Sequence, residues 1–452
     1  MQPFPAFLYH YLGEWVAASK PNLFTSEKAF TMIHKTTHLF RALLLSAAIL
    51  LIASCTKTDD ADNIPPAQQP NQPPVVLVNN NISGTSSAMG YSLFRDLVAD
   101  KPGENVIISP WSLQSALLMA TEGAVGPART DLEALLRLEN TNLETLRNEY
   151  SAVHSSLTST ANHPTVTSAN AFFYDSDRIA VNPSYANLTE TYYDAGVQNL
   201  PFSDPSSKDE INNWVSERTN ELVPTILEDP IPVSQAFYLI NALYFKSDWM
   251  QGFDADFTFP GEFRRGDGSV IETPVISDSR MILYTETQEL KMVDLAFKDS
   301  TFSLSMIVPK SDDVTDQSWL EGVSPQGLSE LYSELDVEYL NLRFPEMDLA
   351  FREDLIPNIK NLGYDAPFAS PPADFSGISD QHGDVIALDP VLHEVRLKVD
   401  EHGAEGAAVT VVGGVVTSAP PVVAFDRPFV LSLRHIPTGV QLFFGLVDKP
   451  MP

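Results

Sequence analysis

The sequence is poor in cysteine and in basic residues. Its 452 residues include one cysteine, and 28 Lys and Arg face 59 Asp and Glu, for a formal net charge of −31. One cysteine excludes an intrachain disulfide and any zinc site built from cysteines. So acidic a surface repels phosphate backbones and anionic headgroups, which argues against nucleic-acid binding. The 44% of hydrophobic residues can form a sizeable core, so disorder of the whole chain is excluded.

Sequence motifs of common enzyme classes are also missing. The chain has no G-x-S-x-G, H-E-x-x-H, P-loop or G-x-G-x-x-G segment, and its nine histidines show no metal-binding spacing. We therefore expect no metal and no cofactor. Missing motifs disfavour an enzyme, although residues far apart in sequence can still assemble a catalytic triad in space.

The N-terminal region indicates export. Arg41 precedes Ala42–Ser54, an uncharged run of thirteen residues that is too short to span a bilayer, as in a secretory signal. The run ends at the single cysteine, Cys55, and Ile52–Cys55 resembles the lipobox of bacterial lipoproteins, whose cysteine is lipidated. The alternative is a buried cysteine after a short core helix. We expect an exported lipoprotein of the outer membrane or cell surface, either periplasmic or extracellular, with a lipid anchor on Cys55.

Four segments are predicted along the chain. The signal fits a start at Met32, so residues 1–31 are interpreted as a mis-assigned upstream extension and 32–54 as the signal peptide. Residues 55–82 hold the lipidated cysteine and a disordered tether with five prolines. Lys57 and two acids just after Cys55 are similar to surface-export signals of some Gram-negative lipoproteins, or belong to a merely solvated linker. Residues 83–452 contain no second linker and form the globular domain.

Helix and strand patterns are mixed in the globular part. Ser109-Pro110 predicts a helix start and Gly123 its end, and Ser207–Glu210 predicts a capping box before Ile211. Helical signals gather early and strand signals late, which favours an α+β fold over repeated βαβ units. The predicted strands are Ala169–Tyr174, Ala236–Phe245, Phe302–Val308, Val391–Val399, Phe429–Arg434 and Gln441–Val447.

The last third holds an unusual pair of segments. In Val391–Val399 the odd positions are apolar except His393, which by itself indicates a hydrogen-bonded core histidine. Gly406–Phe425 follows, twenty residues without charge. Glycine and proline pairs argue against a membrane span, and the length exceeds an ordinary core strand. A third structure is a segment that inserts as a strand, with Glu405 facing water and small residues facing the core: Ala404, Gly406, Ala408 and Thr410. The sequence pattern by itself still favours an ordinary core strand over this third structure.

Six short motifs in this order resemble the serpin family of protease inhibitors. They span about 370 residues, so the match covers the whole globular part. The segments that carry it are Asn105–Leu113, Asn170–Phe173, Asn241–Trp249, Asp374–Ile378, His393 with Glu401, Gly403 and Glu405, and Asp426–Phe429 with Phe443–Gly445.

The resemblance implies a fold and a mechanism. Helices would pack around a large mixed sheet A and smaller sheets B and C, with an exposed reactive-centre loop. A serine protease would cleave the loop, and the loop would insert into sheet A and trap the acyl-enzyme, so the chain would be a suicide substrate and not an enzyme. The alternative is a non-inhibitory serpin that acts as a binding or chaperone-like module. The expected state is a monomer.

The resemblance also assigns site residues. The family's scissile bond lies sixteen residues after the hinge glutamate and eleven before the proline of the closing strand, and both counts give Thr417–Ser418. Val415 and Val416 precede it, and a shift of one residue would make Val416 the bait. Small aliphatic residues there suit elastase-like or subtilisin-like proteases. The implied hinge is Glu401, Gly403, Ala404, Glu405, Gly406, Ala407 and Ala408. The polar cluster implied beneath the parting strands consists of Ser109, Ser112, Asn241 and His393. The residue implied at the point where insertion begins is Trp249.

One hinge residue departs from the family pattern. Inhibitory members usually have alanine where this chain has Gly406, which should slow insertion slightly. No bulky residue or proline occupies Ala404 or Ala408, so the hinge remains permissive.

Overall fold

A computed structural model describes residues 81–451 except 139–140, 159–164, 299, 370, 372, 382–385 and 405–419. All of these described residues belong to one compact unit, Gln68–Pro452. The predicted extension, signal and most of the tether therefore lie outside the described residues. The first helix, α2 (Asn81–Asp100), begins two residues before the predicted domain start at Ser83.

Helices form most of the first half of the unit. In α3 (Pro110–Gly123) the Ser109 hydroxyl accepts the Ser112 amide, Pro110 opens the first turn, and the helix ends at Gly123, as predicted. The prediction of a capping box at Ser207 is wrong. The helix begins at Ser206 with Pro205 as its cap, and the Ser207 hydroxyl donates to the Pro201 carbonyl instead. The other helices are α4 (Gly126–Leu135), α5 (Leu143–Thr158), α6 (Pro183–Tyr193), α7 (Ser206–Arg218), α8 (Pro325–Ser333) and α9 (Ile356–Asn361).

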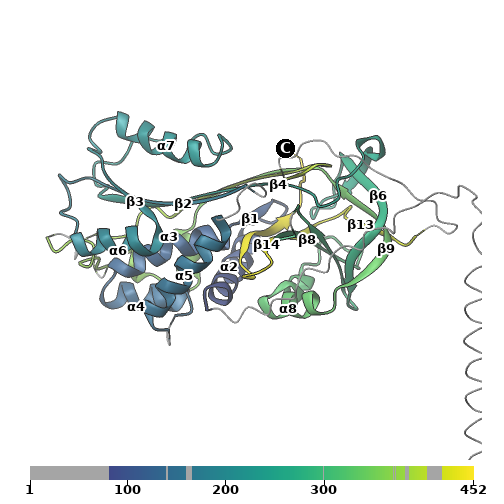
Figure 1. Ribbon diagram of the computed structural model, residues 1–452, viewed down its shortest axis with the longest axis horizontal. Helices are drawn as coiled ribbons and strands as arrows, with labels where there is room; N and C mark the ends of the chain where they lie inside the picture. The colour runs from purple at the N-terminus through teal and green to yellow at the C-terminus, as the bar shows by residue number, and fades with distance from the viewer. Residues whose placement is uncertain are drawn as a thin grey trace, which may run out of the picture. The chain divides into compact units, whose positions relative to one another are not determined.

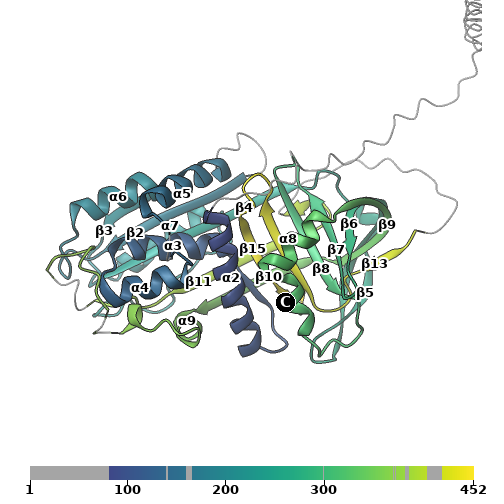
Figure 2. The same cartoon turned by 90° about the horizontal axis from the view of Figure 1, so that it is seen from below.

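A large sheet fills the second half. Its strand order is β1-β15-β14-β8-β7-β6-β9-β13, with β5 paired to β6. The uncharged runs of β8 and β15 are buried at every position, and α8 lies beside β8 (Figures 1 and 2). The strands are β1 (Val106–Ile108), β5 (Phe259–Arg264), β6 (Val270–Glu286), β7 (Leu290–Ala296), β8 (Phe302–Pro309), β9 (Asp336–Pro345), β13 (Val422–Ala424), β14 (Phe429–His435) and β15 (Gln441–Val447).

A second sheet lies between two helical layers. Its order is β12-β4-β2-β3, formed by β2 (Thr165–Tyr174), β3 (Ala195–Asn199), β4 (Phe237–Asp248) and β12 (Gly403–Ala404). Helix α7 covers one face, and α3, α5 and α6 lie on the other (Figure 1). Alternate residues of β4 pack into separate cores: Phe237 and Phe245 join the main core, whereas Tyr238 and Ile240 join a smaller core under α7.

The third sheet is a pair of strands, β10 (Met347–Asp354) and β11 (Leu392–Val399), in antiparallel register. In the described part of the chain β11 does not pair with β4. Strands β4 and β11 nevertheless line one cavity of about 80 Å³, together with α3 and α7. The second and third sheets are therefore neighbours along an unpaired gap between β4 and β11, and we call the two sheets together the divided sheet.

None of the helices in the described part combines the length and apolar character needed to cross a bilayer.

Candidate functional site

The chain between β11 and β12 is held at the end of this gap where strands β4 and β11 finish. Strand β12 pairs antiparallel with β4, with Gly403 opposite Asp248 and Ala404 opposite Ser247. The Trp249 amide donates to the His402 carbonyl at 2.8 Å, and the Trp249 indole donates to the Asp400 carbonyl at 2.9 Å. The first residues of the predicted hinge thus already occupy the edge of β4.

Gly403 permits this close approach. Its φ is +148°, and a Cβ atom there would lie 2.1 Å from the Ser247 carbonyl oxygen. Real side chains do not tolerate such a contact, so any other residue would push β12 away from β4. Glycine at this position is a requirement of the strand pairing.

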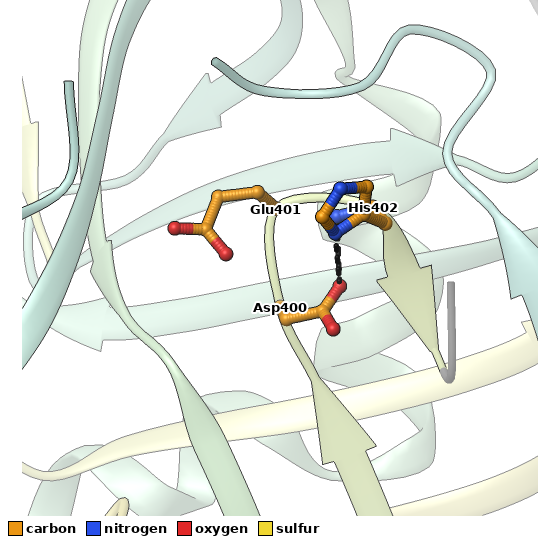
Figure 3. A group of neighbouring side chains, drawn as sticks. All are labelled: Asp400, Glu401 and His402. Carbon is orange, nitrogen blue, oxygen red and sulfur yellow. Dashed lines mark hydrogen bonds and ion pairs between the residues drawn. The ribbon is translucent and has the colours of Figure 1, made fainter. Parts of the chain in front are cut away.

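The turn before β12 is acidic. The Asp400 carboxylate accepts the amides of His402 and Gly403 at 2.7 and 3.2 Å. The Glu401 side chain is only 7% exposed and accepts a hydrogen bond from the Thr258 hydroxyl. Figure 3 shows its carboxylate pointing away from the His402 ring, whose Nδ1 lies 3.5 Å from Asp400 Oδ1.

These three side chains have ligand atoms within 4.8 Å of one another. Asp400 is engaged by two backbone amides, and Glu401 by a threonine hydroxyl. The cluster is therefore explained as a hydrogen-bonded turn, and we assign no metal to it.

A polar cluster lies beside the cavity, near the start of β11. Four predicted residues meet there: the Ser109 amide donates to His393 Nε2 at 2.9 Å, and the Ser112 hydroxyl donates to the Asn241 carbonyl at 3.4 Å. Burial lowers the pKa of His393 to about 4, so the ring is neutral at pH 7 and Nε2 can accept. The cluster ties α3 to both β4 and β11.

Asn241 is incompletely satisfied. Its Nδ2 donates to Asn170 Oδ1 at 2.9 Å and faces Ser168 Oγ at 3.3 Å. Its buried Oδ1 has no hydrogen-bond partner among the described residues, and Asn241 lines the 80 Å³ cavity. An unpaired buried acceptor is costly, which marks this side of the cavity as a place where a donor would be stabilising.

Sequence reasoning missed the support behind this cluster. The Trp111 indole donates to Ser168 Oγ at 2.8 Å and stacks on Tyr150 at 4.8 Å. Asn170 donates to the Tyr150 hydroxyl, and His154 Nε2 lies 2.6 Å from the Ser168 carbonyl oxygen. Burial raises the pKa of Tyr150 to about 12. The residues come from α3, α5 and β2, and no spacing in the sequence links them.

The remaining predicted site residues lie outside the described residues: Glu405, Gly406, Ala407, Ala408, Val415, Val416, Thr417, Ser418 and Cys55.

Comparisons with known proteins fit this geometry. A family model described as Serpin (serine protease inhibitor) matches residues 85–450. Glia-derived nexin of Rattus norvegicus is 26% identical over 373 residues, covering 80% of this chain and 92% of its own. Serpin-Z2A of Triticum aestivum is 30% identical over 379 residues, covering 78% and 92%.

Solved structures agree in fold. Native protease nexin-1 with heparin has a TM-score of 0.74 at 24% identity, covering 82% of this chain and all of that one. The thermophilic serpin Tengpin in its native state has a TM-score of 0.73 at 23% identity, covering 81% and 94%. These likenesses confirm the predicted α+β fold. The family match over residues 85–450 shows that the chain belongs to the serpin family, whose members are generally protease inhibitors and not enzymes.

Proposed function

We propose that this serpin is a single-use inhibitor of serine proteases that traps its target by inserting the cleaved loop between β4 and β11. The observation that carries the proposal is the gap itself, with the cavity inside it and β12 already paired to β4 at its end. A fold held one strand short stores free energy that cleavage can release.

The register of β12 indicates how insertion would continue. Ala404 is opposite Ser247, so extending the antiparallel pairing places Ala408 opposite Leu243 and Thr410 opposite Asn241. Leu243 and Asn241 alternate with Tyr238 and Ile240, which pack toward α7. The small loop residues would therefore face the main core, and the Thr410 hydroxyl would reach the unpaired Asn241 Oδ1.

The length of the loop suits the task. Residues 403 to 416, at roughly 3.3 Å per residue, extend on the order of 45 Å as a strand. Insertion over this distance would carry a tethered acyl-enzyme from one end of the sheet to the other. Distortion of its active site before deacylation would then make the complex long-lived.

The direct test mixes the purified full chain with pancreatic elastase or subtilisin and separates the products on a denaturing gel. We expect a band near the summed mass that survives boiling, and mass spectrometry should locate the released peptide at Thr417–Ser418, or one residue earlier if Val416 is the bait. Protease inactivated at its serine is the matched control and should give no such band. Cleavage by both enzymes without a stable complex would contradict inhibition of these targets.

Target choice follows from the loop. Val415, Val416 and Thr417 are small and aliphatic, so we propose elastase-like or subtilisin-like proteases over trypsin-like ones. A trypsin-like enzyme that formed the complex faster than elastase would overturn this choice.

A non-inhibitory binding or chaperone-like role is the second candidate, because Gly406 replaces the usual alanine of inhibitory members. The two are separated by heating the cleaved chain. A gain in thermal stability means that the loop inserts, whereas no gain favours the non-inhibitory role.

We also propose that the chain is exported, lipidated on Cys55 and anchored to a membrane at the cell surface or in the periplasm, and that its inhibitory unit is a monomer. Metabolic labelling with a radioactive fatty acid should mark the wild type and not Cys55→Ser. Equal labelling of both would remove the anchor from the proposal. Size-exclusion chromatography with light scattering tests the monomer.

A further inference from the structure

A short segment after α7 covers one face of the gap between β4 and β11. Residues 221–227 follow the end of α7, and three of them, Val223, Ile226 and Leu227, line the 80 Å³ cavity. The same three side chains are buried in the small core under α7, where they pack with residues of β4 and with Leu392 of β11. A strand that entered the gap would therefore lie directly beneath this segment.

The segment is fastened to α7 by one side chain. Asn212 Oδ1 accepts the amides of Ile226 and Leu227 at 3.0 and 2.8 Å, and its Nδ2 donates to the Leu227 carbonyl at 2.9 Å. Helix α7 in turn packs on β2, where the rings of Trp214 and Phe173 meet edge-on at 5.7 Å. The segment is thus attached to the side of the gap that carries α7, β2 and β4.

Arg352 fastens the same segment to the other side of the gap. It lies on β10, opposite Glu394 of β11. Its Nη1 donates to the Thr225 carbonyl at 3.0 Å and to Glu394 Oε2 at 3.1 Å, and its Nη2 donates to the Ile226 carbonyl at 2.9 Å. One guanidinium group therefore joins the segment to both strands of the third sheet.

The ion pairs of Arg352 differ in exposure. Its pair with Glu228, at 3.3 Å, involves a side chain that is 69% exposed, so this contact contributes little. The Glu394 side chain is 3% exposed, and it also faces Arg396 Nε at 3.5 Å. The hydrogen bonds from Arg352 to Glu394 and to the two carbonyls are partly buried and charge-assisted, which makes them the stronger contacts.

We propose that Arg352 is a positioning residue that clamps the segment across the divided sheet and sets part of the barrier to insertion. A cavity of 80 Å³ is too small for a strand, so β4 and β11 would have to move apart, by up to roughly 4.8 Å, the spacing of neighbouring strands. A hydrogen bond does not survive such a displacement. The bonds of Asn212 to the segment are buried, whereas those of Arg352 are only partly buried, so the Arg352 clamp opens first. This inference rests on the proposed insertion mechanism, although the clamp can be tested without a protease.

Two measurements on the uncleaved full chain test the clamp. Amide hydrogen exchange of Ile226 and Leu227 reports closure of the segment, because both amides donate to Asn212. A fluorescent synthetic peptide with the sequence of residues 403–416, followed by fluorescence anisotropy, reports how fast the gap takes up a strand. In Arg352→Met we expect protection of the two amides to fall about tenfold and peptide uptake to accelerate by about the same factor, the change that corresponds to the loss of about one net hydrogen bond.

Arg396→Met is the matched control. Arg396 also faces Glu394, but among the described residues it has no hydrogen bond to residues 221–227, so both readouts should keep their wild-type values. In Arg352→Met the amides of β14 and β15 should stay protected, which separates opening of the segment from a general loss of stability. Arg352→Lys keeps the charge, but its single nitrogen cannot reach both carbonyls. It should shift both readouts in the same direction, and it decides the matter if Arg352→Met does not fold.

Equal behaviour of Arg352→Met and Arg396→Met would overturn the proposal, as would lower amide protection without faster peptide uptake. If neither the wild type nor any variant takes up the peptide, the proposed insertion between β4 and β11 fails, and amide exchange alone decides the clamp. Tenfold lower protection in Arg352→Met then supports the clamp, and unchanged protection overturns it.

Discussion

Gly403 is the residue at which the hinge backbone comes nearest to β4. Its positive φ, and the 2.1 Å that would separate a Cβ at this position from the Ser247 carbonyl oxygen, predict that Gly403→Ala detaches β12. Backbone strain of this kind costs about 1–3 kcal/mol before the clash is added. We expect lower protection of the Trp249 amide and slower formation of the protease complex, measured by hydrogen exchange and by gel densitometry.

Gly84→Ala is the matched control, because a Cβ at Gly84 meets no atom within 4 Å. This helical position should gain about 0.5–1 kcal/mol of stability, with no effect on the hinge. Equal behaviour of the two variants would show that the approach at Gly403 does not control the pairing of β12 with β4.

His393, in the polar cluster beside the cavity, links the stability of the folded chain to pH. Its folded pKa of about 4 lies below the ordinary value of 6.5, so the folded state binds fewer protons than the unfolded state between these values. The stabilisation is complete above pH 6.5 and is lost as pH falls toward 4. At about 1.4 kcal/mol per pKa unit, the loss approaches about 3 kcal/mol.

The measurement compares urea midpoints of wild type and His393→Gln from pH 7 to pH 4. Glutamine can accept from the Ser109 amide and does not titrate, so the variant should lose less stability in acid. Burial also lowers the pKa of His435 to about 4, but that residue is common to both proteins and cancels in the difference. Identical acid sensitivity of the two proteins would contradict the assignment.

At the residue scale, sequence alone predicted part of this site. The period of two in β11 placed His393 on the buried face, and the helix start at Ser109 was confirmed. Nothing in the sequence pointed to Thr258, because its contact with Glu401 joins segments 143 residues apart in the chain. Long-range polar contacts leave no period in a sequence.

At the scale of elements, uniform hydrophobic patterns were more informative than local turn chemistry. Strand β15 has the predicted bounds, and its short uncharged run is buried at every position. The capping box at Ser207 failed because Ser207 Oγ found a partner in the Pro201 carbonyl, outside the helix. The gap between β4 and β11 could not be predicted from composition or spacing, since both strands carry ordinary strand patterns.

The register of β12 predicts the effect of a charge in the hinge. Ala408 would lie opposite Leu243 on the core side, so Ala408→Glu would bury an unpaired carboxylate, at a cost of several kcal/mol. We expect the variant to be cleaved as a substrate, with most of the chain appearing as cleaved product and little as stable complex on a denaturing gel.

Glu405 supplies the control from the opposite face. Its register partner is Lys246, an exposed residue of β4, so Glu405→Ala should leave the yield of complex nearly unchanged. A high yield of complex from Ala408→Glu would show that the loop does not insert in this register.

At the scale of the whole molecule, the fold and the charge serve different ends. The net charge of −31 predicts repulsion of polyanionic partners, whereas the proposed loop insertion depends on the divided sheet. The family was predictable because six motifs occur in order along the chain, a global property that no single motif carries. The missing pairing between β4 and β11 could not be predicted from the sequence, because no residue pattern shows which strands fail to pair.

The divided sheet predicts a large gain in stability on cleavage. An inserted strand would add about ten backbone hydrogen bonds across β4 and β11, each contributing about 1 kcal/mol, and would fill the 80 Å³ cavity. For a unit of this size the gain corresponds to a rise in melting temperature of about 10 °C or more, by calorimetry of chain cleaved within the loop.

Thr410→Val should reduce the gain by about 1 kcal/mol, because the Asn241 Oδ1 acceptor would stay unpaired in the cleaved form. The uncleaved Thr410→Val chain should melt like the wild type, since the predicted partner of Asn241 acts after insertion. An unchanged melting temperature after cleavage would mean that the gap stays open, and the inhibitory mechanism would then fail with it.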